Sequence, residues 1–159
     1  MINIHDDFLD KKEFAKVSKN ILGEWFPWYF NDNGVYPGDG HWQFVHSFYT
    51  KNQPSSQFIE LTRDLVPENS VLIRIKANCT TKAESPSQLP FHIDCTWLER
   101  EYTTSIFYVN TNNGFTVFEN GEKIESVANR LITFPSSMKH TGITSTDDRR
   151  VLINFNYFE

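Results

Sequence analysis

The stretch RVLINFNYF, residues 150–158, shows the pattern that decides the fold. Side chains along a β-strand point alternately to its two faces. One face would carry a largely polar set, namely Arg150, Leu152, Asn154 and Asn156. The other face would carry only apolar and aromatic residues, namely Val151, Ile153, Phe155 and Tyr157. We therefore predict a strand whose polar face lines a cavity and whose apolar face packs under helices.

Short runs with strand character fill the chain after Pro67. They cover residues 71–77, 91–97, 103–110, 115–120, 122–128 and 130–135, and turn residues separate them. Asn120 and Gly121, between two of these runs, are typical of a type I′ hairpin. So many short strands in succession predict a mainly β protein with a jelly-roll barrel.

The first 70 residues show helical patterns instead. Apolar residues recur at helical spacing from residue 8 to residue 21 and stop before Gly23, and Asp6, Asp7 and Asp10 near the start offer N-cap acceptors. Residues 31–41 are rich in Gly, Pro, Asn and Asp and predict a loop, and residues 55–66 predict a second helix. We expect a single domain over residues 1–159, with a helical buttress at 1–70 and a jelly-roll core at 71–159.

Charge and composition exclude several classes of protein. The formal net charge of -5 argues against a nonspecific nucleic-acid binder, which needs a basic surface. The sequence has no apolar run long enough to span a bilayer, and its N-terminus is too polar for a signal peptide. Cys79 and Cys95 match neither a zinc motif nor a disulfide framework. We expect a cytoplasmic protein with two free structural thiols and no nucleic-acid or membrane partner.

Aromatic residues make up 15% of the chain and gather in residues 25–30 and 42–49. Such rings can line a substrate groove, but they are most often used to fill a core. His41 and His46 lie in the same region without a carboxylate at a useful spacing. We interpret both histidines as packing or surface residues and favour the core as the place of the rings.

The stretch FHIDC, residues 91–95, is a candidate metal site. On a strand, His92 and Asp94 would share a face. The same spacing occurs by chance at His5, where a helix should begin and the two side chains would diverge. The only later histidine is His140. Two imidazoles and one carboxylate form the facial triad of Fe(II) sites with open positions, whereas a structural zinc site needs a fourth ligand.

Two further residues suggest a site for an anion. The planar guanidinium of Arg150 suits bidentate capture of a carboxylate, and the hydroxyl of Tyr108 could assist it. Taken singly, Arg150 could be a solvated surface charge and Tyr108 a core ring with a wet tip. The neighbouring Arg149 competes for the role of Arg150. The apolar face of residues 150–158 favours Arg150, because Arg149 at the site would bring that face into a polar cavity.

In their order along the chain, several motifs together resemble the 2-oxoglutarate- and Fe(II)-dependent oxygenases, in particular the prolyl-hydroxylase-like branch. They are HID, SIFYVN, GFTVFENG, NRLITFPSSMKHTG and RRVLINFNYF, which cover roughly residues 71–159. The resemblance implies a double-stranded β-helix and a reaction with 2-oxoglutarate and O2. It also implies that His92, Asp94 and His140 bind Fe(II), while Tyr108 and Arg150 bind 2-oxoglutarate.

The resemblance leaves the substrate open and has one departure. Many members have Gly-Gly where this chain has Asn113 and Gly114. The first 70 residues are similar to the compact single-domain members of phages and marine bacteria. A prolyl or other peptidyl side chain is the substrate that the resemblance favours, with a small molecule as the other option. Two other functions stay open: a noncatalytic jelly-roll binding or structural module, and a cupin-type metal dioxygenase that does not use 2-oxoglutarate.

Overall fold

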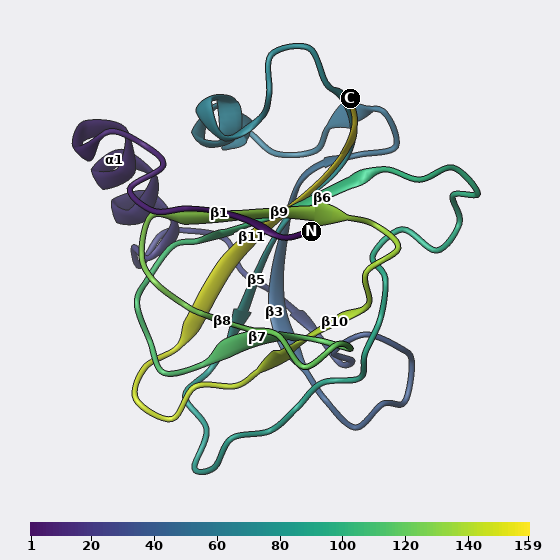
Figure 1. The fold of residues 1–159 in the computed structure, drawn as a ribbon. Coiled ribbons are helices and arrows are strands. Elements are labelled where there is room, and N and C mark those ends of the chain that lie inside the picture. Colours follow the sequence, from purple (N-terminus) through teal and green to yellow (C-terminus); the bar gives the residue numbers. More distant parts are fainter.

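The computed structural model describes all 159 residues and contains two antiparallel sheets that face each other (Figure 1). The larger sheet consists of β1 (Asn3–His5), β2 (Tyr29–Asn31), β3 (Gln43–Thr50), β4 (Gln53–Pro54), β5 (Val71–Thr80), β6 (Thr103–Tyr108), β9 (Arg130–Pro135) and β11 (Arg150–Phe158). The smaller sheet consists of β7 (Phe115–Phe118), β8 (Lys123–Glu125) and β10 (His140–Ile143). The helices are α1 (Lys11–Ile21) and the 3-10 helix η1 (Ile59–Leu65), and neither has the length and apolar character of a membrane span.

The chain passes back and forth between the two sheets after β5. Strand β6 lies in the larger sheet, β7 and β8 in the smaller one, β9 in the larger, β10 in the smaller and β11 in the larger. Isolated bridges add residues 88–92 to the free edge of β10, through Gln88 to Ile143 and His92 to His140. This alternation is the winding of a double-stranded β-helix, so the predicted jelly-roll barrel is confirmed.

Strand β11 lies at the centre of the larger sheet and has the two faces that its sequence predicts. It pairs with β5 on one side and β6 on the other. Val151, Ile153, Phe155 and Tyr157 belong to one core that also contains buried residues of α1 and η1. Figure 1 shows both helices outside the barrel, on the outer side of the larger sheet. Arg150, Leu152 and Asn154 line a cavity on the inner side.

A second, smaller core fills part of the space between the sheets. It contains Ile106, Tyr108, Phe118, Ile124, Ile132, Phe134 and Leu152, which come from β6, β7, β8, β9 and β11. The polar cavity lies beside it, against β5 and β10. The barrel interior is therefore divided between an apolar core and a polar site.

The N-terminal third contains more strand than the sequence predicts. The strands β1, β2, β3 and β4 all lie within residues 1–54, so the expectation of a mainly helical buttress is wrong in its proportions. Helix α1 begins at Lys11 because the carboxylate of Asp10 accepts hydrogen bonds from the backbone N–H groups of Lys12 and Glu13. Phe8 precedes this cap, and His5 pairs with Leu131 of β9 instead of starting a helix.

The aromatic residues before residue 50 are divided between core and surface. Phe26 and Phe48 are buried in the outer core, and His46 lies between them with ring centroids at 4.5 and 4.7 Å. Both ring nitrogens of His46 have partners, the Pro27 carbonyl and the Ser56 hydroxyl. The packing interpretation of His46 is confirmed. Six rings are exposed instead, namely Phe8, Trp25, Tyr29, Phe30, Tyr36 and Trp42.

Two local predictions in the barrel are wrong. Residues 91–97 form no strand, because among them only His92 bridges to β10. The β7–β8 hairpin exists, but its turn is not type I′, since only Gly121 has a positive φ (87°). The hydrogen bonds from Gly121 N and Phe118 N instead define a three-residue loop with glycine in the left-handed region.

Candidate metal centre and carboxylate site

Three potential metal ligands converge where residues 88–92 meet β10. One ligand atom each from His92, Asp94 and His140 lies within 4.8 Å of the others. The backbones of His92 and His140 exchange two hydrogen bonds of 3.0 Å, which brings their ring centroids to 4.7 Å. His92 Nε2 is 3.8 Å from Asp94 Oδ1. The lone strand bridge at His92 is thus sufficient to assemble the predicted triad.

Hydrogen bonding at His92 and burial at His140 prepare the two imidazoles to act as metal ligands. His92 Nδ1 lies 3.0 Å from the Pro90 carbonyl. A carbonyl only accepts, so Nδ1 donates this hydrogen bond and Nε2 is left as the nitrogen that can bind a metal. Burial lowers the pKa of His140 to about 4, and its Nδ1 is buried without a hydrogen-bond partner. Neutral imidazole is the form that binds metals.

The carboxylate of Asp94 is held by two residues of the larger sheet. Arg74 Nη2 on β5 is 3.0 Å from Asp94 Oδ1, and Asn156 Nδ2 on β11 donates to Oδ2 at 2.9 Å. Arg74 Nε also donates to Asn156 Oδ1 at 3.1 Å. Burial alone would raise the pKa of Asp94, but the Arg74 guanidinium holds this pKa well below its usual range. The carboxylate is therefore ionised and oriented.

The chemistry of these donors fits Fe(II). Two neutral nitrogens and one carboxylate oxygen form a three-ligand set, and the triad includes no fourth His, Cys, Asp or Glu. Cys95 is not a lining residue of the cavity: it is fully buried, and its backbone N–H donates to the Tyr102 hydroxyl. All three ligands line the cavity, so positions on that side are open to small molecules.

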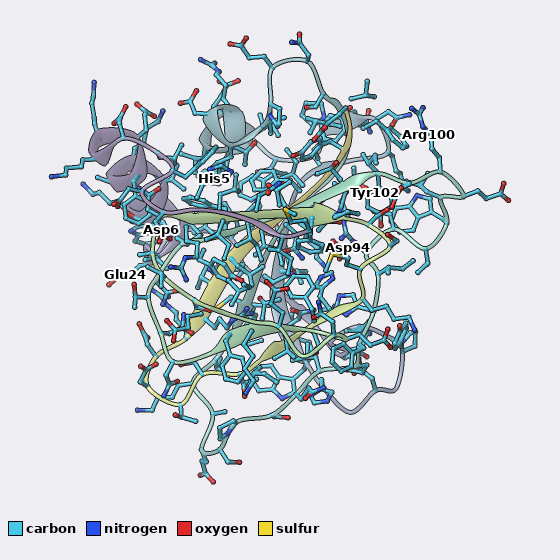
Figure 2. The ribbon with its side chains drawn as sticks, in the orientation of Figure 1. His5, Asp6, Glu24, Asp94, Arg100 and Tyr102 are labelled. Carbon is cyan, nitrogen blue, oxygen red and sulfur yellow. The ribbon has the colours of Figure 1, made fainter.

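The triad lines a cavity between the two sheets. Figure 2 shows Asp94 inside the barrel, well apart from His5 and Asp6 beside the N-terminal strand. The polar residues that line the cavity beyond the triad include Lys76, Asn78, Thr80, Thr116, Arg150 and Asn154. His5 is exposed and belongs to no metal-ligand group, so its His-x-Asp spacing has no structural counterpart to the triad.

Arg150 is a buried cation in this cavity without an acidic partner. Its side chain is only 6% exposed, and it takes part in no salt bridge. Arg150 Nε donates to Ser126 Oγ at 2.9 Å and Nη2 donates to Thr116 Oγ1 at 2.8 Å. A buried guanidinium that is bonded only to hydroxyls remains uncompensated in charge. An anion in the cavity would supply that compensation.

Two glycines make room for the guanidinium. A Cβ on Gly114 would lie 2.8 Å from Arg150 Cδ, and one on Gly142 would lie 3.2 Å from Nη1. The neighbouring Asn113 accepts hydrogen bonds from Ser145 Oγ and the Thr146 N–H. It therefore fixes the loop before β11 and leaves the close approach at Gly114 unchanged.

Tyr108 lies behind the cavity wall. It is fully buried and is not among the lining residues, and its hydroxyl forms a 2.8 Å hydrogen bond with Thr116 Oγ1. The Arg150 guanidinium lies 5.7 Å from the centre of its ring. The structure thus brings Tyr108 to Thr116 and Arg150, and its part in ligand binding stays a prediction.

Arg149 points to the opposite side of β11. Its Nη2 donates to the Leu22 carbonyl at 2.7 Å, at the C-terminal end of α1. Asn110 sets this register, because its Oδ1 accepts from Val151 N and its Nδ2 donates to the Arg149 carbonyl. Arg150 is thereby fixed on the cavity side, as the pattern of residues 150–158 predicts.

Comparisons with known proteins agree with this fold. No protein-family model and no curated protein matches the sequence. Among solved structures, a 2OG-Fe(II) oxygenase-family oxidoreductase from Burkholderia pseudomallei is similar over 99% of this chain and 85% of its own, with 12% identity and a TM-score of 0.74. A Trichoplax adhaerens prolyl hydroxylase, in complex with a hypoxia-inducible-factor peptide fragment, is similar over 99% of this chain and 83% of its own. It has 18% identity and a TM-score of 0.66.

A third similar structure is SnoK, described as a non-heme alpha-ketoglutarate-dependent carbocyclase from nogalamycin biosynthesis. It covers 99% of this chain and 79% of its own, with 10% identity and a TM-score of 0.67. At these identities the similarities show a shared fold. The resemblance to 2-oxoglutarate oxygenases and prolyl hydroxylases that the motifs predict is confirmed in structure, whereas the likeness to phage members stays a prediction.

Proposed function

We propose that the protein is an Fe(II)- and 2-oxoglutarate-dependent dioxygenase that hydroxylates its substrate. One observation carries the proposal: a three-ligand centre with open positions shares a cavity with a buried guanidinium that has no acidic partner. A dicarboxylate that chelates a metal at one end and meets a guanidinium at the other matches this arrangement. The shared fold of 2OG-Fe(II) oxygenases supports it.

In this proposal His92, Asp94 and His140 hold Fe(II), and Arg150 holds the far carboxylate of 2-oxoglutarate. The bound iron, with 2-oxoglutarate and O2, supplies the oxidising chemistry. Thr116 orients the guanidinium, and Tyr108 holds the Thr116 hydroxyl from behind.

The surrounding residues keep the ligand atoms in the protonation state and orientation that bind a metal. Arg74 and Asn156 each bond one oxygen of Asp94, which keeps the carboxylate ionised and fixes its direction. The Pro90 carbonyl fixes the proton of His92 on Nδ1. The buried position of His140 keeps its ring neutral and limits the water that reaches the centre. The chain thus positions reactants while the metal carries the reaction.

For the substrate, we propose a prolyl or other peptidyl side chain. The prolyl hydroxylases among the similar structures support this choice, and the carbocyclase among them keeps small molecules as the second option. A noncatalytic jelly-roll module would leave the triad and Arg150 without a role. A cupin-type dioxygenase that does not use 2-oxoglutarate would have no need of a buried carboxylate clamp.

We further propose that residues 1–159 form a single domain and that it is cytoplasmic. The N-terminal residues are integral to the barrel, because β1 pairs with β9 and β3 pairs with β5. Both cysteines are free and buried, which suits a reducing compartment. Fractionation of the native host and limited proteolysis of the chain test these two statements.

The decisive experiment for this function is a titration without oxygen. Fe(II) and then 2-oxoglutarate are added to the protein, and the weak visible charge-transfer band of the complex is recorded. Exposure to O2 should then give succinate, slowly without substrate and faster with a peptide library that mass spectrometry reads for an added oxygen. A protein that binds Fe(II) but gives neither the band nor succinate would contradict the proposal.

A further inference from the structure

The wall of the cavity contains polar atoms that the protein leaves without partners. They are Asn78 Oδ1, Thr80 Oγ1 and Asn154 Oδ1, all of them buried, together with His140 Nδ1 of the triad. Buried polar groups in proteins almost always have a hydrogen-bond partner, so a cluster without partners indicates a place where a polar ligand binds. Asn78 and Thr80 lie on β5, and Asn154 lies on β11 beside it.

Lys76 lies beside this cluster, two residues before Asn78 on β5. It lines the cavity from β5 and is paired in register with Asn154. It takes part in no salt bridge. Burial and the neighbouring Arg74 lower the pKa of Lys76 to about 8, so the side chain still carries a positive charge at pH 7. An ammonium that lines a cavity without an ion-pair partner is stabilised by a bound anion.

In the proposed complex, the charge of Lys76 is not balanced by a neighbouring anion. The two positive charges of Fe(II) and the one of Arg150 are matched by Asp94 and the two carboxylates of 2-oxoglutarate. The remaining cations are Arg74 and Lys76. Arg74 already bonds Asp94 at 3.0 Å, whereas Lys76 has no such contact. The filled cavity would therefore keep two positive charges in surplus, on Arg74 and Lys76, and of these two only Arg74 has a carboxylate beside it.

The position of Lys76 distinguishes it from Arg150. Residues two apart on one face of a strand are separated by roughly 7 Å. Lys76 is one such step from Arg74, which holds Asp94, and two steps from Thr80, which is paired with Arg150. It is therefore closer along the strand to the metal end of the cavity than to the guanidinium end.

We propose, on the basis of the function above, that Lys76 is a second carboxylate-binding residue, which contacts a carboxylate at the metal end while Arg150 holds another. The side-chain amides of Asn78 and Asn154 lie beside it, and either can turn its NH2 group toward the same carboxylate. That carboxylate belongs either to the metal-chelating end of 2-oxoglutarate or to the substrate. The two sources share one chemistry and are separable by experiment.

The test measures binding without turnover. The full chain is loaded with Mn(II) in the absence of oxygen and titrated calorimetrically with 2-oxoglutarate. The saturated complex is then titrated with acetate and, in parallel, with the neutral isostere acetamide. The variants are Lys76→Met, Lys76→Arg as the charge-preserving rescue, and Lys82→Met as a control for an exposed lysine just past the same strand. Mn(II) affinity and urea unfolding show whether each variant is folded.

Two results support the inference and assign the source. A loss of about tenfold or more in 2-oxoglutarate affinity in Lys76→Met, with recovery in Lys76→Arg, assigns the carboxylate to 2-oxoglutarate. Unchanged 2-oxoglutarate affinity with loss of acetate binding, and no effect on acetamide, assigns it to the substrate. Lys82→Met should match the wild type in both titrations.

Two other results would overturn the inference. If folded Lys76→Met equals the wild type in both titrations, Lys76 binds no carboxylate and the inference is overturned. If the wild-type protein binds Mn(II) but not 2-oxoglutarate, the proposed function itself is contradicted, and this inference falls with it.

Discussion

The two faces of β11 are both buried, yet they have opposite chemistry. On the outer face Ile153 and Phe155 are fully buried among apolar residues, beneath α1 and η1. On the inner face Arg150 and Asn154 are each only 6% exposed and face a polar cavity. Burying apolar groups stabilises a fold, whereas burying an unpaired cation opposes it. The outer face therefore serves stability, and the inner face is explained by a ligand.

The largest expected effect comes from truncating the outer face. Phe155→Ala removes a fully buried ring from the outer core and should lower the free energy of unfolding by ~3–5 kcal/mol. Asn154→Ala on the inner face should change it by less than ~1 kcal/mol, because Asn154 Oδ1 has no partner to lose. Urea unfolding of both variants measures the difference. Equal losses would show that the inner face also holds the fold together.

The adjacent arginines provide the next comparison. Arg150→Ala removes a charge-assisted hydrogen bond of ~1.5–3 kcal/mol and should weaken 2-oxoglutarate binding roughly ten- to hundredfold. Arg149→Ala removes only the contact with the Leu22 carbonyl on the outer side and should leave that affinity unchanged. The dissociation constants of the two Mn(II)-loaded variants for 2-oxoglutarate show which arginine binds it. The reverse ranking would transfer the role to Arg149 and contradict the register of β11.

A smaller effect is expected on the pH dependence of stability, and it concerns His46, one of two buried imidazoles. His46 on the outer side has both ring nitrogens bonded, whereas His140 on the inner side has a bare Nδ1. Burial lowers the pKa of His46 below 6.5, so the unfolded chain takes up the proton first as the pH falls. Stability should then fall below pH 6.5, by at most ~1.4 kcal/mol per pH unit for this one proton.

The measurement is the urea midpoint between pH 7.5 and 5.5, compared with His46→Gln, which has no titrating ring. The drop below pH 6.5 should be shallower in the variant. Above pH 6.5 His46 is mostly neutral in both the folded and the unfolded chain, so the urea midpoints of the two proteins should change with pH in the same way there. An identical pH slope in both proteins would show that His46 is not the group responsible.

The sequence predicts those features that depend on alternation within one strand. The period-two pattern of residues 150–158 was sufficient to place Arg150 inside and Phe155 outside. It was likewise sufficient for β9, whose bounds match the predicted run. The spacing of His92 and Asp94 and the position of His140 indicated the triad, although residues 91–97 form no strand.

Features that depend on distant partners were not predicted. Arg74 bonds Asp94 from β5, and only pairing with β11 brings it there. A signal existed, because Arg74, Lys76, Asn78 and Thr80 alternate with Ile75, Ala77 and Cys79. Strand β3 was missed because its rings resemble any apolar core segment, and its strand conformation depends on pairing with β5.

The central claim is that His92, Asp94 and His140 form the metal site, and it is tested most directly by metal binding. Purified protein, His140→Ala and His5→Ala are each titrated with Fe(II) without oxygen, and bound iron is determined per chain. His5 has the same His-x-Asp spacing but lies exposed on β1, so it is the matched control. The account predicts one iron per chain in the wild type and in His5→Ala, and none in folded His140→Ala. Iron retained by His140→Ala and lost by His5→Ala would contradict it.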